Sequence, residues 1–125
     1  MTYLQRSSAR PILTDLAPEV VRLLAESFDA YGLEVIVNGE PLRWDEITEV
    51  EVAKAARALG PAGWIVRHVV HGEERYHVGI YAGSREQIIP NVSLEAARAI
   101  LSALAYYAPR PIHYTGPADL VPLTS

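Results

Sequence analysis

The sequence predicts an α+β domain in which two amphipathic helices pack on an antiparallel sheet of three to five strands. Two segments with helical periodicity, 16–31 and 93–108, flank a stretch of strand-like alternation centred on 64–81. The length of 125 residues falls in the range of about 100–150 residues that is typical of one domain. We therefore expect a single domain over 1–125.

The two ends of the chain differ from the rest. Segments 1–14 and 109–125 lack a sustained period, and the second contains four prolines. We expect both to be extended arms. Chain ends stay ordered only where they are tied down, so ordered arms would dock on their own domain or on a neighbouring subunit.

Both predicted helices have start signals. Asp15 can cap the helix at 16–31, in which apolar residues recur at steps of three and four. Ser93 can cap the helix at 93–108, and Pro109 ends it.

Strand signals occupy the middle of the chain. Residues 33–44 predict a hairpin around the turn Asn38-Gly39. The next stretch, 45–59, is ambiguous: its acidic start and alanine-rich second half favour a helix over most of it, whereas a strand through 48–53 is the alternative.

Residues 64–81 predict a second hairpin, with the turn at 71–74 and His68 opposite His77. A short third strand is expected at 86–89, before a proline. One face of the hairpin should lie on the core, and the other is left to solvent, a ligand or a partner.

Composition argues against several classes of function. The formal charge is −4, and the basic residues, nearly all arginine, never form a run, so we expect no nucleic-acid binding. There is no cysteine for a disulfide, a zinc ribbon or a thiol nucleophile. No apolar stretch approaches the roughly 18 residues of a membrane span, and the N-terminus lacks a secretory signal, so we expect a cytoplasmic protein. The arginine preference suggests a GC-rich genome or a thermophile, and we favour codon bias.

The histidines are the first candidates for chemistry. His68, His71 and His77 lie within ten residues, near Glu73 and Glu74, and these residue types bind zinc. Their spacing matches no established metal motif, and half-exposed histidines also occur on ordinary sheet faces. No serine elbow or phosphate loop is present either. We therefore expect no metal, no cofactor and no catalytic set.

Aromatic residues predict an interaction surface, because amphipathic rings are enriched at interfaces. The outer face of the predicted 64–81 hairpin would combine two of them with two histidines, and such a face needs a cover, a ligand or a partner. The candidate interface residues are Trp64, His68, His77, Tyr81, Tyr106, Tyr107 and Tyr114.

One family resemblance is visible. The run VNGE at 37–40, then LRWDEI at 42–47, then strands and the helix at 93–108, resembles bacterial pleckstrin-homology-like domains over residues 33–108. Those domains commonly show an extended segment that ends in a Trp-x-x-Ile step, a curved antiparallel sheet and a closing C-terminal helix. Two predicted helices, one before this run and one just after it, depart from the pattern. The resemblance implies a binding or scaffolding module and carries over no functional residue.

We therefore expect a non-enzymatic binding or assembly subunit that contacts itself or another protein subunit and forms an oligomer. Its contacts would use the outer hairpin face or the arms. The alternative is a small enzyme or ligand-binding protein with a pocket on the 64–81 hairpin. In that case His68, His77 and Tyr81 would line the pocket, with a histidine as the general base.

Overall fold

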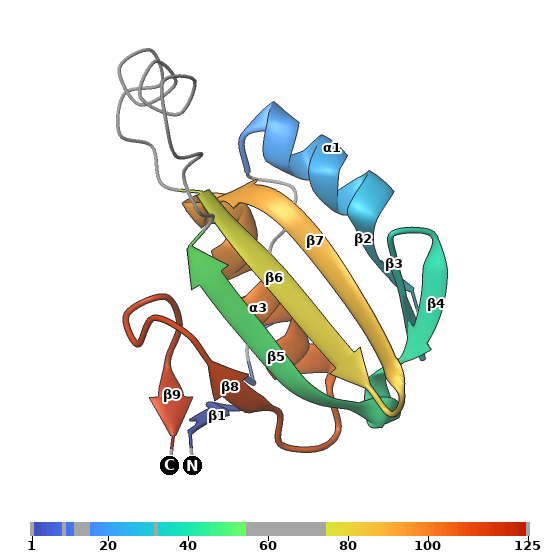
Figure 1. Ribbon diagram of the computed structural model, residues 1–125, viewed down its shortest axis with the longest axis vertical. Helices are drawn as coiled ribbons and strands as arrows, with labels where there is room; N and C mark the ends of the chain where they lie inside the picture. Colours follow the sequence, from blue (N-terminus) through green and yellow to red (C-terminus); the bar gives the residue numbers. More distant parts are fainter. Residues whose placement is uncertain (1, 9, 12–15, 32, 55–74, 125) are drawn as a thin grey trace, which may run out of the picture.

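The computed structural model describes residues 2–8, 10–11, 16–31, 33–54 and 75–124. Within them the chain forms a six-stranded mixed sheet, a three-stranded antiparallel sheet and two α-helices (Figure 1). The α+β class is as predicted, whereas the main sheet has more strands than the three to five expected.

The elements in chain order are β1 (Tyr3–Leu4), α1 (Pro18–Ser27), β2 (Phe28–Tyr31), β3 (Glu34–Val37), β4 (Glu40–Arg43), the 3-10 turn η1 (Trp44–Glu46), β5 (Ile47–Lys54), β6 (Arg75–Ala82), β7 (Arg85–Ser93), α3 (Leu94–Tyr107), β8 (His113–Thr115) and β9 (Leu123–Thr124). The main sheet has the order β7-β6-β5-β8-β1-β9, and the smaller sheet has the order β2-β3-β4. Among the strands that the structure describes, β5 and β8 run parallel and the other pairs are antiparallel.

The first helix is shorter than the predicted 16–31. α1 ends at Ser27, and the residues after it form β2, which pairs with β3. Phe28 is buried opposite Val37 in this ladder. The sequence misleads here because Phe28 keeps the four-residue spacing from Leu24, so the helical pattern runs on past the point where strand pairing begins.

The hairpin predicted at 33–44 is confirmed as β3 and β4. Asn38 and Gly39 both have positive φ, 52° and 83°. Positive φ at both central residues is the conformation that favours Asn-Gly in two-residue turns.

The interpretation of 45–59 as mostly helix is wrong where the structure describes it. Ile47–Lys54 form β5, close to the alternative strand at 48–53, and 55–59 lie outside the described residues. Val50 and Val52 are buried and Glu51 is exposed, which is the alternation of a strand. β5 pairs on both sides, with β6 and β8, and this pairing overrides local helix preference.

β6 forms the second half of the predicted 64–81 hairpin; the first half lies outside the described residues. Within the described residues, β6 pairs with β5 on one side and β7 on the other. Val78 and Ile80 are buried, as predicted for its core face.

The third strand and the second helix are confirmed near their predicted bounds. β7 contains the expected 86–89 and continues through Pro90, which is tolerated because β7 is an edge strand. Ser93 caps α3: its Oγ accepts a hydrogen bond from the Ala96 N–H at 3.2 Å.

α3 supports one side of the main sheet. It packs against β6 and β7 and also contacts α1. Figure 1 shows α3 behind the sheet, so that the opposite face of β5–β6–β7 points toward the viewer. No helix of the described segments is long and apolar enough to cross a membrane.

Both predicted arms contribute strands to the main sheet. β8 extends the sheet from β5, and β1 lies between β8 and β9. The two ends of the chain lie side by side at β1 and β9 (Figure 1). We expected ordered arms to dock either on their own domain or on a neighbouring subunit. The strands β1, β8 and β9 dock on the chain's own sheet.

Candidate functional site

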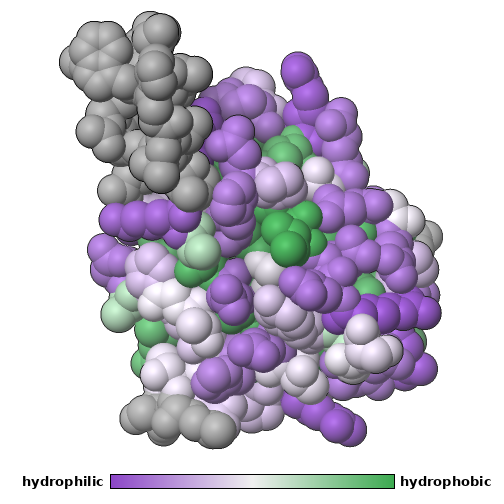
Figure 2. Space-filling model, viewed as in Figure 1, coloured by the Kyte–Doolittle hydropathy of each residue, from purple (hydrophilic) through white to green (hydrophobic). Residues whose placement is uncertain are grey.

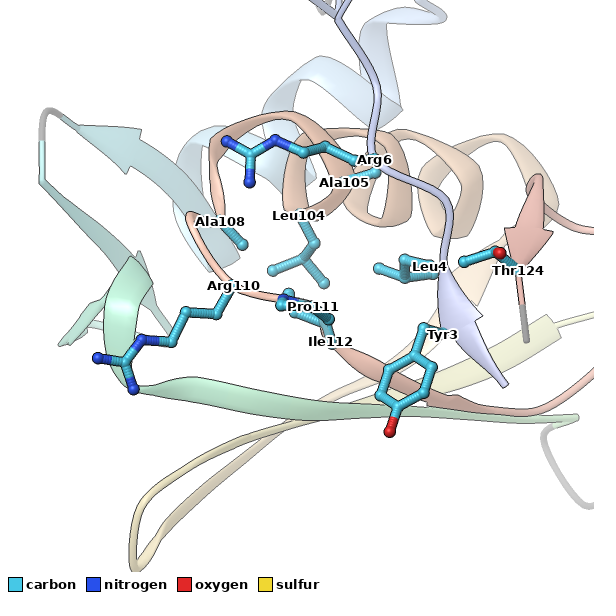
Figure 3. A pocket seen from close by; sticks show the side chains of 10 residues that line it. All are labelled: Tyr3, Leu4, Arg6, Leu104, Ala105, Ala108, Arg110, Pro111, Ile112 and Thr124. Atoms are coloured by element: carbon cyan, nitrogen blue, oxygen red, sulfur yellow. The ribbon is translucent and has the colours of Figure 1, made fainter. Parts of the chain in front are cut away.

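A pocket opens where the two arms meet the C-terminal end of α3 (Figure 3). Its volume is about 330 Å³, near the lower limit of the roughly 300–1,000 Å³ usual for small-ligand sites. The apolar lining consists of Leu4, Leu104, Ala105, Ala108, Pro111 and Ile112. The polar lining consists of Tyr3, Arg6, Arg110 and Thr124. We call this site the arm pocket.

Backbone hydrogen bonds hold the N-terminal arm in place around the arm pocket. The Leu4 N–H donates to Ile112 O at 3.0 Å, and the Ser7 N–H donates to Ala105 O at 3.1 Å. The arm therefore crosses the last turns of α3. Leu4, Leu104 and Ile112 are buried members of the core, so the pocket floor is a place where the core reaches the surface.

The rim of the arm pocket is positively charged. Arg6 and Arg110 are exposed, and their side chains lead away from the apolar floor to separate corners of the rim, whereas Tyr3 and Thr124 lie on the opposite side of the pocket (Figure 3). Arg6 Nη1 donates to Pro109 O at 3.1 Å, which leaves other guanidinium N–H groups free to contact a ligand. The described lining contains no carboxylate. An apolar floor beside two guanidinium groups suits an amphipathic anion.

His77, one of the predicted site residues, supports a β-bulge. It lies on the outer face of β6, and its Nδ1 accepts a hydrogen bond from the Asn91 N–H at 3.0 Å. Asn91 has a φ of 55° and lies where β6 and β7 lose their one-to-one register. This hydrogen bond requires an unprotonated Nδ1, so the neutral imidazole carries its proton on Nε2.

Tyr81 lies on the same face of β6, in a separate environment. It is four residues from His77, about 13 Å at the usual strand rise. Its ring lies over Gly79, where a Cβ would be 3.5 Å from the ring. Burial raises the pKa of the Tyr81 hydroxyl, and the charges of Glu51 and Glu86 raise it further. The structure therefore does not join His77 and Tyr81 into one site.

The face that carries these residues is largely polar where the structure describes it. Figure 2 shows hydrophilic side chains over most of this side, with small apolar areas between them. The predicted residues Trp64 and His68 lie outside the described residues. A role for this face as an interface stays a prediction.

The main sheet also contains a histidine–carboxylate pair that no pattern in the sequence predicts. His113 Nδ1 lies 3.6 Å from Glu49 Oε1, and the two residues are register partners in the parallel ladder of β8 and β5. The Tyr3 ring meets the His113 ring edge-on, with centroids 5.7 Å apart. The pair becomes an ion pair when the imidazole is protonated.

The three remaining tyrosines of the predicted interface set have different surroundings. Tyr107 stacks on Trp44, with ring centroids 5.1 Å apart, and Tyr106 meets Tyr107 edge-on at 4.9 Å. Both are half-buried, and their role at an interface stays a prediction. Tyr114 is buried, and its hydroxyl donates to Pro117 O at 2.6 Å. It stabilises the C-terminal arm from inside the protein.

Metal ligands do not gather in the part of the chain that the structure describes: no three His, Cys, Asp or Glu side chains there could hold an ion together. Of the histidine cluster considered above, only His77 is described; His68 and His71 lie outside.

Comparisons with known proteins give no relatives. No protein family, curated protein or solved structure matches the chain. The chemistry and geometry of the residues are therefore the basis for a function.

The arm pocket could not be found from the sequence. Arg6 and Pro109, which are hydrogen-bonded at its rim, are 103 positions apart. Neither Arg6 nor Arg110 belongs to a recognisable motif, and only the pairing of the arms brings the two arginines to one site.

Proposed function

We propose that this protein is a non-enzymatic binding module that holds a partner protein at the arm pocket. The observation that carries this proposal is the combination of an apolar floor with exposed arginines at the rim. Binding sites are typically concave and apolar, with a few polar groups that fix the orientation of the ligand.

The pocket is also held in shape before binding. Its walls come from the end of α3 and from arms that are hydrogen-bonded to α3 and to each other. Binding therefore has to order little of this protein's own main chain, which lowers the entropic cost of association.

We propose further that the chain is a pleckstrin-homology-like module. The Trp-x-x-Ile step lies at η1, where the three-stranded sheet ends and β5 begins. Trp44 stacks on Tyr107 near the end of α3, so the step contacts the closing helix. The extended segment, the Trp-x-x-Ile step, the following strands and the C-terminal helix occur along the chain in the order that the resemblance implies. This order supports a binding role.

The alternative, a small enzyme or ligand-binding protein with His68, His77 and Tyr81 in one pocket, has less support from the two of these residues that the structure describes, His77 and Tyr81. The Nδ1 of His77 already accepts the Asn91 amide, and Tyr81 lies about 13 Å along the strand. A shared pocket for the two side chains would require a different arrangement of this face.

The first test is a titration with hexan-1-ol, a neutral apolar probe, followed by NMR shifts of backbone amides. We expect saturable shifts at Leu104, Ala105 and Ile112, because these residues lie at the floor. Thr124→Phe at the exposed rim should block the shifts.

Two further variants complete this test. Ala108→Leu should also block the shifts, since it fills the floor, while Ala25→Leu on the exposed side of α1 should leave them unchanged. The proposal is wrong if folded wild-type protein shows no saturable shifts around the pocket, or if both blocking variants bind the probe like wild type.

A further inference from the structure

We infer that the exposed face of the main sheet around Tyr81 binds an arginine side chain of a partner protein. This face lies opposite α3 and points toward the viewer in Figures 1 and 2. It is separate from the arm pocket, because β6 lies three strands from β1 in the sheet and Tyr81 does not line the pocket. The inference therefore goes beyond the proposed function and does not rest on it. We call this surface the Tyr81 patch, and its members are Glu49, Glu51, Gly79, Tyr81, Glu86 and Ile88.

Three carboxylates surround the Tyr81 hydroxyl. Tyr81 on β6 is the register partner of Glu49 on β5 and of Glu86 on β7, and Glu51 follows Glu49 on the same face of β5. Burial raises the pKa of the Tyr81 hydroxyl, and the charges of Glu51, Glu86 and Glu49 raise it further. Of the three, Glu49 already lies 3.6 Å from His113 Nδ1. A positive charge beside the hydroxyl is attracted by all three carboxylates.

Two of these carboxylates lack a cation in the part of the chain that the structure describes. Glu51 and Glu86 are exposed, and neither forms an ion pair there. Arg85, the neighbour of Glu86, contacts β4 instead. The other basic residues of β5 and β6, Lys54 and Arg75, lie toward the opposite end of the two strands. The patch is therefore complementary to a positively charged partner.

The Tyr81 ring gives this cation a surface to lie on. The ring lies over Gly79, where a Cβ would be 3.5 Å away, and Tyr81 is half-buried, so part of the ring is open to solvent. Gly79 is the register partner of Glu51 on one side and of Ile88 on the other. The Ile88 side is apolar and 49% exposed. A group on the ring therefore has a carboxylate on one side and an apolar side chain on the other.

These neighbours suit arginine better than lysine. A guanidinium is planar and weakly hydrated, so it can stack on an aromatic ring while its N–H groups reach a carboxylate. An ammonium is a compact, strongly hydrated charge that does not stack. In an extended segment, residues two positions apart point to the same side. An apolar residue two positions from the arginine would then contact Ile88.

The experiment uses an N-acetylated peptide amide of sequence Ser-Leu-Ser-Arg-Ser, together with versions in which lysine or citrulline replaces the arginine. Binding to the full chain is followed by backbone amide shifts at low ionic strength, where exposed charges are least screened. We expect the arginine peptide to bind at least about tenfold more tightly than the neutral citrulline peptide, and about threefold more tightly than the lysine peptide. Ethylguanidinium, the cation without a peptide, should bind at least about threefold more weakly than the arginine peptide.

Variants assign the binding to the Tyr81 patch. Glu51→Gln and Tyr81→Leu should each lower the affinity for the arginine peptide about threefold. Tyr81→Phe keeps the ring and should bind like wild type. Glu51→Gln changes an exposed residue, so it tests the site even if Tyr81→Leu fails to fold. Glu34→Gln, at an exposed position of β3 in the smaller sheet, is the matched control and should bind like wild type.

Each contrary outcome overturns a stated part of the inference. Equal affinity for the arginine and citrulline peptides overturns the cation, and equal affinity for the lysine peptide overturns arginine. Ethylguanidinium as tight as the peptide overturns the polypeptide in favour of a small cation. A loss in Glu34→Gln as large as in Glu51→Gln overturns the site, since the attraction would then come from the overall charge of −4. Binding of hexan-1-ol at the arm pocket is independent of all these results, so the proposed function is tested separately.

Discussion

The buried hydroxyl of Tyr114 should make the protein sensitive to alkali. Tyr114 lies in β8 with its ring buried, and its hydroxyl donates to Pro117 O at 2.6 Å. Burial, followed by the charges of Asp119 and Tyr76, raises the pKa of this hydroxyl to about 12. An unfolded chain would release the same proton near pH 10.

The sign of the effect follows from this difference. Because the folded pKa lies above the unfolded value, the stabilisation is complete below about pH 10 and is lost as the pH rises from there to about 12. In that window Tyr114 removes about 1.4 kcal/mol of unfolding free energy per pH unit, and on the order of 2–3 kcal/mol in all.

The measurement is urea unfolding of wild type and Tyr114→Phe from about pH 8 to 11.5. At pH 8 the variant should be less stable by about 1 kcal/mol, because it lacks the hydrogen bond to Pro117. Above about pH 10 only wild type must deprotonate a buried phenol, so the difference should shrink and then reverse. Tyr106→Phe, at a half-buried ring, controls for the loss of a hydroxyl elsewhere.

The other groups that titrate at alkaline pH are present in both wild type and Tyr114→Phe. Their effects therefore cancel in the difference in unfolding free energy between the two proteins. A difference in unfolding free energy that stays constant from pH 8 to 11.5 would show that Tyr114 does not titrate as its burial requires.

Three substitutions test the backbone around the arms and the bulge, and Gly39→Ala serves as the control for Gly116→Ala. Gly116→Ala should cost about 2–3 kcal/mol in urea unfolding, since its Cβ would lie 2.6 Å from Val52 O at a φ of 152°. Gly39→Ala, with positive φ but open space, should cost only about 1–2 kcal/mol; equal costs would mean that β8 moves aside. His77→Ala should lower the unfolding free energy by about 1 kcal/mol through loss of the Asn91 hydrogen bond. An unchanged unfolding midpoint would leave His77 free for the chemistry of the alternative enzyme.

The elements that the sequence predicts correctly are those whose signals are local. Asn38-Gly39 requires positive φ at two adjacent residues, and this conformation fits few residues other than Asn and Gly. Ser93 caps α3 through an amide three residues away. In both cases the residues that determine the structure are neighbours in the chain, so no tertiary information is needed.

The errors lie where distant partners decide. β2 continues the helical spacing of α1 but pairs with β3, and β5 precedes helix-forming residues but pairs with β6 and β8. A strand gains its backbone hydrogen bonds only from its neighbours in the sheet, and those neighbours cannot be read from its own residues.

The sequence alone determined the class of the fold, one hairpin turn and the helix that supports the main sheet. Only the tertiary structure decided where the arms lie, because β1 finds its place through pairing with strands more than a hundred residues away. The arm pocket follows from that pairing: Arg6 and Arg110 have no pattern in common until the sheet brings them to one rim.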